Sequence, residues 1–332
     1  MFVEDLLSRY ERSLVEHVQK AAMFLTKCQL IEPWVSEGRL YGCVSPWELG
    51  KWLGAYEDFH DTLEAIWVWA VYRYLTGDSA FDHNMRAAVT YVTKNYDRFL
   101  NTSSPAFMYD ASHVLHTSYV LEALLGDASL QDIAKQIVDS LLKYVLNLSS
   151  LQGRAYDDPW WAIACLLRYC KYHGYSDVVN ELRRLVISQV ERQQENFFTN
   201  VQDEPAYIGP GGHDFFCHNS NRVLALYEAL SCYNDNLLKH MLEIFASKVP
   251  TGFVKRHADE NAWNAHLATG IALAFRVTKN NRLLKVYDNI MRELEVRSQD
   301  FAISRSPDVP LKESWATYFY VQAHVALVLG IW

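Results

Sequence analysis

Glycine and proline are scarce in this chain of 332 residues, which holds 14 and 9 of them. All-β folds need more turn residues than this, so a helical fold is favoured. No dense cluster of lysine and arginine occurs and the net charge is −8, which argues against a nucleic-acid partner. No apolar run reaches membrane-spanning length, and residues 1–30 are amphipathic without a hydrophobic signal core. We expect a cytoplasmic protein with no membrane partner.

The sequence motifs of several common functional sites are also missing. The six cysteines form no C-x-x-C pair, and neither a glycine-rich phosphate loop nor a G-x-S-x-G stretch is present. We therefore expect reduced thiols, no metal and no cofactor. Aromatic residues are plentiful instead, with 10 Trp, 20 Tyr and 15 Phe. Such rings either fill a core or line a cleft for sugars or isoprenoids.

Short breaks such as Thr76-Gly77-Asp78 and Leu125-Gly126-Asp127 recur along the chain at irregular intervals typical of helical-hairpin repeats. Each break follows an apolar helix and precedes an amphipathic one. The expected amphipathic helices are 4–28, 80–99, 128–147, 177–194, 235–248 and 281–298. The expected apolar helices are 58–75, 111–125, 159–173, 214–232, 261–278 and 314–330. Apolar helices belong inside and one-sided helices outside.

This alternation predicts an all-α fold, an (α/α)6 toroid of six helical hairpins that forms one domain over residues 1–332. A two-domain helical arrangement is the alternative. In a closed toroid all six inner helices run in the same direction, so the long loops before them meet on one face. These loops are 29–57, 100–110, 148–158, 195–213, 249–260 and 299–313. Helix N-termini on that face favour carboxylates and anionic ligands, so we expect the functional site there.

The stretch Arg154–Tyr169 carries the clearest signal on that face. Asp157 and Asp158 stand directly before Pro159 and two tryptophans, and Asp158-Pro159 is typical of an N-cap and first helical position. Glycoside cleavage needs one carboxyl group to protonate the leaving oxygen and a second as nucleophile or base. Asp157 and Asp158 are the first candidates for this pair, with Asp58 and Asp110 as further catalytic candidates and Asp214 and Glu260 in reserve.

Side chains that could bind a sugar come from all the inner-helix loops. Flat rings stack on sugar faces, whereas Asn, Arg and His bond the hydroxyl groups. The substrate-binding candidates are Tyr156, Trp160, His113, His213, Asp214, His218, Asn219, Arg256, His257, Glu260, Trp263 and Trp315. Structural roles compete with this interpretation. Asp158 and Asp110 could only cap their helices, His113 and His116 could be structural, and Trp160 and Trp161 cannot both face a cavity.

The hairpin pattern resembles that of the six-hairpin glycosidase superfamily. Within it, Tyr156-Asp157-Asp158-Pro159-Trp160-Trp161 is similar to the Tyr-Asp-Asp-x-x-Trp-Trp stretch of endo-α-1,6-mannanases. The resemblance implies that Asp157 and Asp158 are the catalytic pair and that the partner is a small carbohydrate. In this chain the tryptophans come one residue sooner and a proline intervenes. The resulting hypothesis is a glycoside hydrolase-like enzyme acting on an oligosaccharide.

Other functions remain open on the same face. Enzymes similar to N-acylglucosamine 2-epimerase are toroids that use histidines on this face for proton transfer, and resemblance to them implies a sugar epimerase or isomerase. Six histidines of this chain could carry out such a transfer: 113, 116, 213, 218, 257 and 266. A non-catalytic carbohydrate-binding or interaction toroid is the third hypothesis. Residues 57–61 resemble the aspartate-rich Mg²⁺ motif of class I terpene synthases, which implies an isoprenoid synthase or cyclase. Cys217-His218 is similar to the zinc-bound pair of lanthionine-cyclase-like toroids but lacks their glycine-rich setting.

Overall fold

The computed structural model describes most of the chain and leaves several of the long loops out. The described residues are 2–31, 38–47, 59–104, 106–148, 158–198, 216–232, 234–255, 260–298, 302–306 and 309–332. All statements below refer to these residues. Within them, every helix is too short or too polar to cross a membrane.

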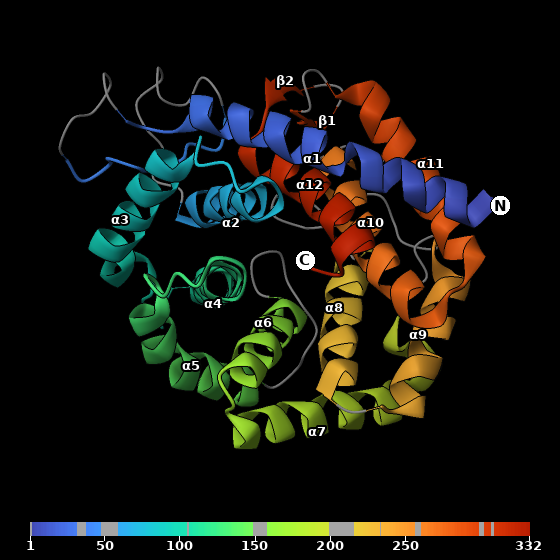
Figure 1. The fold of residues 1–332 in the computed structure, drawn as a ribbon. Helices are drawn as coiled ribbons and strands as arrows, with labels where there is room; N and C mark the ends of the chain where they lie inside the picture. The colour runs from blue at the N-terminus through green and yellow to red at the C-terminus, as the bar shows by residue number, and fades with distance from the viewer. Residues whose placement is uncertain are drawn as a thin grey trace.

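Twelve α-helices lie in this part of the chain and alternate between an outer and an inner layer (Figure 1). The outer helices are α1 (Phe2–Cys28), α3 (Asp82–Phe99), α5 (Gln131–Leu146), α7 (Ser176–Gln193), α9 (Asn236–Lys248) and α11 (Asn281–Arg297). The inner helices are α2 (Phe59–Thr76), α4 (Phe107–Leu125), α6 (Pro159–Tyr172), α8 (Phe216–Cys232), α10 (Glu260–Thr278) and α12 (Ser314–Leu329). A 3-10 turn, η1 (Gln194–Phe197), follows α7.

The layers follow from the apolar pattern of each helix. In α12 almost every side chain from Ser314 to Leu327 is buried, because its neighbours cover it on all sides. In α11 the buried side chains recur every three or four residues, as a helix covered on one face requires. The toroid predicted from the alternation of apolar and amphipathic helices is therefore confirmed.

The inner helices form a closed ring in which each contacts the next and α12 returns to α2. Contacts at both ends show that the helices run in parallel. At the N-terminal ends, Ser314 of α12 donates a hydrogen bond to Asp61 of α2. At the C-terminal ends, Arg276 of α10 donates to the carbonyl oxygen of Leu327 in α12 over 2.9 Å. Contacts near the N-terminal ends also join α2 to α4, α6 to α8 and α8 to α10. The inner-helix N-termini thus lie on one face of the ring, as expected; we call it the N-terminal face.

The middle of the ring is filled by Trp332, which lies where Figure 1 marks the end of the chain. Its ring stacks on His116 with centroids 4.9 Å apart and lies 5.1 Å from the ring of Trp161. The guanidinium of Arg168 lies 3.9 Å from its ring centroid. Arg168 and Trp332 both donate hydrogen bonds to Oε1 of Glu228, over 2.9 and 2.7 Å. These buried groups link α6, α8 and the segment after α12.

Two features differ from the expectation. Helix α4 begins at Phe107, four residues earlier than predicted, so Asp110 stands inside its first turn and not in the preceding loop. The segment before α12 forms a small antiparallel hairpin of β1 (Ser304–Ser306) and β2 (Val309–Lys312), which helix periodicity cannot reveal. An isolated bridge between Trp47 and Glu313 adds the segment before α2 to this hairpin. The N-terminal face is therefore partly built from extended chain.

Candidate functional site

Carboxyl groups concentrate at the N-terminal face. Five of them are buried, and they come from α2, α4, the N-cap of α6, α10 and the N-cap of α12: Asp61, Asp110, Asp158, Glu260 and Glu313. Burying a carboxylate is costly unless hydrogen bonds or opposite charges compensate, and the positive ends of the helix dipoles contribute to this. The site is therefore defined by how each of these groups is paired.

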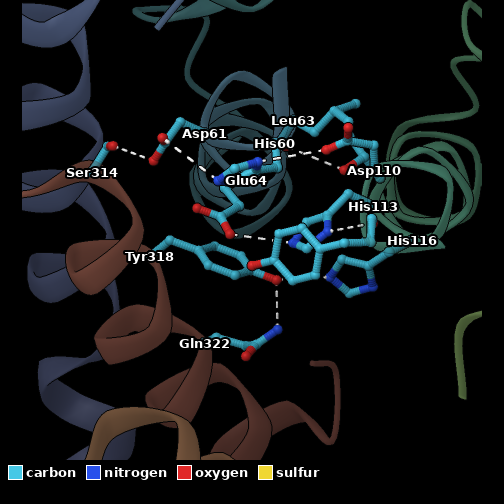
Figure 2. Close-up of polar contacts among 12 residues, drawn as sticks. His60, Asp61, Leu63, Glu64, Asp110, His113, His116, Ser314, Tyr318 and Gln322 are labelled. Carbon is cyan, nitrogen blue, oxygen red and sulfur yellow. Dashed lines mark hydrogen bonds and ion pairs between the residues drawn. The ribbon is translucent and has the colours of Figure 1, made fainter. Parts of the chain in front are cut away.

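His60 in the first turn of α2 lies between two carboxylates (Figure 2). Its Nδ1 is 3.5 Å from Oδ1 of Asp110 on α4, and its Nε2 is 4.0 Å from Oδ2 of Asp61. Asp61 in turn accepts a hydrogen bond from Ser314. About a quarter of the His60 side chain is exposed, at 24%, so the imidazole is accessible from this face.

Asp110 does not cap α4. The N-cap is Ala106, without a side-chain cap, and Asp110 follows four residues later. The alternative that Asp110 only caps its helix is therefore wrong. Its buried carboxylate faces His60 of the neighbouring helix, an arrangement that secondary structure does not require.

A second acid–imidazole pair lies one turn deeper. Nε2 of His113 is 3.2 Å from Oε1 of Glu64, and both side chains are buried (Figure 2). Nδ1 of His113 lies 3.0 Å from the carbonyl oxygen of Tyr109, which can only accept, so Nδ1 carries a hydrogen. The pair is a close contact between two ionisable groups of neighbouring inner helices, enclosed below the mouth of the site.

Tyr318 and His116 lie below this pair, and both are uncharged. Tyr318 accepts a hydrogen bond of 2.6 Å from Gln322, and its hydroxyl lies 3.0 Å from Nε2 of His116 (Figure 2). Complete burial, with the charges of Arg168 and His113 as smaller causes, holds the pKa of His116 well below its usual range. Burial likewise raises the pKa of Tyr318 far above its usual range. Tyr318 therefore donates to a neutral His116, and this layer positions other groups and supplies no charge.

Asp158 begins α6 as predicted. Its Oδ1 accepts a hydrogen bond of 2.9 Å from the backbone N–H of Trp160, so the expected N-cap is confirmed. Its Oδ2 accepts one of 2.6 Å from Nδ2 of Asn221 on α8, and Oδ1 of that amide lies 2.7 Å from Nε2 of His266 on α10. Hydrogen bonds to both oxygens stabilise the charged form of a carboxylate. The side chain of Asp158 is thus held in one orientation and connected to two further inner helices.

The two tryptophans after Asp158 point in different directions. The Trp160 ring is buried against Phe197 of η1, with centroids 5.0 Å apart, on the side of the outer layer. The Trp161 ring lies toward the ring centre, 5.1 Å from His113 and 6.3 Å from His266. A different aromatic pair stands half-buried on α10 and α12, namely Trp263 and Trp315, with centroids 5.6 Å apart.

The structure also shows the positions of two other candidates, Glu260 and Asn219. Glu260 forms an ion pair with Arg297 of α11, so its carboxylate is compensated from the outer layer. Asn219 is completely buried in the first turn of α8. Several candidates lie outside the described residues: Asp58, Tyr156, Asp157, His213, Asp214, Arg256 and His257, together with the side chain of His218. For these, the sequence-based assignment stays a prediction.

Sequence reasoning missed Glu64 and Gln322. Both are polar residues within largely apolar stretches of inner helices, LEAIWVW and YVQAHVA. A buried position makes such a residue costly unless it has a partner, and this is the signal that could have revealed them. His113, the partner of Glu64, lies on another helix and cannot be read from helix periodicity. Tyr318, the partner of Gln322, lies four residues earlier on the same helix, a spacing that puts both side chains on one face.

No protein-family model matches this sequence, and neither does any curated protein. Solved structures do match. A GH76 α-1,6-mannanase from Salegentibacter has a TM-score of 0.65 and 9% identity, over 95% of this chain and 99% of that chain. A variant of that mannanase with two consecutive aspartates changed to asparagine, described as inactive, is in complex with α-1,6-mannotriose and has a TM-score of 0.64.

Two further matches carry other activities. An unsaturated glucuronyl hydrolase from Bacillus has a TM-score of 0.62 and 14% identity, covering 97% of both chains. A cellobiose 2-epimerase from Bacillus thermoamylovorans has a TM-score of 0.62 and 11% identity, over 94% of this chain and 98% of that chain. At such identities the likeness concerns the fold. This chain has the (α/α)6 toroid fold that these enzymes share, as its hairpin pattern predicted.

Proposed function

We propose that this protein is a carbohydrate-active enzyme that hydrolyses a glycosidic bond in an oligosaccharide, with Asp157 and Asp158 as its carboxyl pair. The observation that carries the proposal is the position of Asp158, a buried carboxylate at the start of α6 on the N-terminal face. A mannanase of the same fold is inactive when two consecutive aspartates are replaced. Asp157 and Asp158 are consecutive in this chain.

The hydrogen bonds of Asp158 favour one role over the other. A carboxylate that accepts from Trp160 and Asn221 is stabilised as an anion, which suits a nucleophile or a base that removes a proton from water. The leaving oxygen then needs a proton from a second carboxyl group. Asp157 is our first assignment for this acid. Asp110 is the second, because its contact with His60 connects it to a group that can return a proton.

The half-buried pair Trp263 and Trp315 supports a sugar as the ligand. Sugar rings present flat C–H faces, and two aromatic rings held at a rim offer a stacking surface. Hydroxyl groups of the sugar would find donors and acceptors in the amide and imidazole groups of the same face. We propose that a small oligosaccharide lies across the N-terminal face, with its scissile bond above Asp158.

The test is a substrate screen with wild type and Asp158→Asn. Asparagine is as good an N-cap as aspartate, so the substitution removes the charge and keeps the helix start. The matched control is Asp235→Asn, since Asp235 caps outer helix α9 by accepting from the N–H of Leu237. Aryl glycosides, α- and β-linked oligosaccharides and unsaturated uronides serve as substrates, and NMR follows the anomers.

We expect turnover of one substrate class to fall by about a thousandfold or more in Asp158→Asn, as when a group essential to bond cleavage is lost. Asp235→Asn should keep wild-type turnover. Equal activity of Asp158→Asn and wild type would remove Asp158 from the mechanism. Binding of oligosaccharides without any turnover would support the non-catalytic toroid instead.

A sugar epimerase is the second candidate, favoured by the two acid–imidazole pairs. Epimerisation removes a proton from the carbon beside a carbonyl group and returns one to the opposite face, so it needs groups that exchange protons. His60 and the His113–Glu64 pair could perform such exchange. Incubation of reducing disaccharides in D₂O distinguishes the two reactions. The epimerase would be established if wild type and Asp158→Asn incorporate deuterium at that carbon and His60→Gln does not.

A further inference from the structure

The toroid closes where its first helix meets its last hairpin. Helix α1 packs on α11 and α12, across a seam that no loop connects (Figure 1). The seam contains two groups of polar side chains. Asp288 of α11 accepts a hydrogen bond of 2.9 Å from the Tyr10 hydroxyl and forms an ion pair with Arg9, both on α1. Two turns further along α1, the seam contains a second polar group of three residues.

His17 of α1, Glu295 of α11 and His324 of α12 each direct one ligand atom to a common point. The two imidazole nitrogens and the carboxylate oxygen all lie within 4.8 Å of one another. Both histidines are buried, with exposed fractions of 5% and 0%, and their ring centroids are 4.3 Å apart. Glu295 is half-buried, so the group opens to solvent on one side only.

His324 is arranged like a metal ligand. Its Nδ1 lies 3.1 Å from the carbonyl oxygen of Tyr320, which fixes the hydrogen on Nδ1 and leaves a lone pair on Nε2. Among the described residues, that buried Nε2 has no hydrogen-bond partner. A buried acceptor without a donor is costly, whereas a histidine bound to metal through one nitrogen commonly donates its other N–H to a backbone carbonyl.

Both imidazoles are also in the form that binds metal. Burial lowers the pKa of His17 to about 4, with the charge of Glu16 acting in the opposite direction. Burial and the neighbouring His17 lower the pKa of His324 to about 3. Near neutral pH neither ring has to release a proton before it coordinates an ion. Burial raises the pKa of Glu295, so its carboxyl group would lose any bound proton when the ion enters.

We propose that His17, Glu295 and His324 form a binding site for a divalent transition-metal ion of the zinc type, which joins α1 to α11 and α12 across the seam of the toroid. Two imidazoles and one carboxylate are a common ligand set for such ions, whereas Mg²⁺ and Ca²⁺ prefer oxygen ligands. Zinc bonds of ~2.0–2.1 Å at tetrahedral angles separate ligand atoms by about 3.3 Å. Binding therefore needs side-chain movements of about 1 Å, and a water molecule on the Glu295 side would complete the coordination.

The experiment uses the full chain without a histidine tag, stripped with a chelator and then titrated with ZnCl₂ in a calorimeter and in thermal unfolding. Glu295→Gln and His17→Gln remove one ligand each. Glu295→Gln preserves the shape of a half-exposed side chain, so we expect it to fold. The matched control is His240→Gln, because His240 and Glu243 form a histidine–glutamate pair on the exposed surface of α9. CoCl₂ adds a visible absorption band that reports the ligand geometry directly.

We expect one Zn²⁺ per chain and a rise in Tm of about 4 °C at a hundredfold excess over Kd. Zinc affinity should fall at least tenfold in Glu295→Gln and His17→Gln and stay unchanged in His240→Gln. MgCl₂ should give no shift in Tm. The proposal is overturned if wild type binds neither Zn²⁺ nor Co²⁺ at 100 µM (about the upper end of a specific site), or if the affinity depends on His240 and not on Glu295.

Discussion

The buried pair of Arg168 and Glu228 allows a quantitative test of how the ring is held together. Nη2 and Nε of Arg168 lie 2.8 and 2.9 Å from Oε1 of Glu228, and the two side chains are 6% and 5% exposed. Arg168 also donates a hydrogen bond of 2.8 Å to the main-chain oxygen of Trp332, and the indole N–H of Trp332 donates one to Glu228. Glu228→Leu would leave the guanidinium cation buried without its carboxylate partner.

Removing one partner of such a buried pair costs about 3–5 kcal/mol, because the remaining charge stays desolvated. We therefore expect Glu228→Leu to lower the free energy of unfolding by about 3 kcal/mol or more, and Arg168→Met by a similar amount. The double variant should be more stable than the sum of the single effects implies, by at least about 2 kcal/mol, since it contains no unpaired charge.

The assay is urea unfolding followed by circular dichroism and tryptophan fluorescence, with the m-value compared between variants. The matched control is the exposed pair Glu16–Lys20 on α1, with Glu16→Leu, Lys20→Met and their combination. That pair should show no measurable coupling, because water screens it. Additive effects at Arg168 and Glu228, or a change below about 1 kcal/mol for Glu228→Leu, would refute the reasoning.

Three further predictions concern other parts of the molecule. Gly42 has φ +91°, and a Cβ there would lie 1.9 Å from the carbonyl oxygen of Ala87; Gly42→Ala should lower the free energy of unfolding by about 2–3 kcal/mol in calorimetry. Burial, helped by Arg168, keeps the pKa of His116 below its usual value of 6.5, so the unfolded chain binds protons first as the pH falls. Wild-type stability should therefore decrease from about pH 7 to pH 5, and His116→Gln should show a shallower slope in urea titrations. Asp110→Asn should reduce turnover at least tenfold in the substrate screen, with an unfolding midpoint close to that of wild type, because Asp110 does not cap α4.

The proposals on glycoside cleavage and on the metal ion are independent of each other. Of the carboxyl groups of the first, Asp158 and Asp110 lie at the N-terminal face, at the starts of α6 and α4. The ligands of the second lie between α1, α11 and α12. Loss of zinc binding in Glu295→Gln should leave turnover at saturating substrate unchanged at temperatures well below Tm. A parallel loss of both properties would show that the seam also supports the geometry of the site.

The amino-acid sequence by itself determined the helical hairpins and their layers. Apolar residues around the whole circumference of six segments, and on one face of six others, leave a two-layered ring as the arrangement that buries them all. The start of α6 was also predictable, because Asp158 followed by Pro159 is a local signal whose partner, the N–H of Trp160, is two residues away. Concentration of acids at the N-terminal face followed from the shared direction of the inner helices.

The tertiary structure alone decided which polar groups meet. An inner helix is buried on every side, so its periodicity does not tell which neighbour a side chain faces. The direction of Trp161 toward the ring centre, the pairing of Glu64 with His113 and the contact of Glu260 with Arg297 all depend on how different helices pack together. The same holds for His17 and His324, which ring closure brings together across 307 positions of the chain, the difference between their residue numbers.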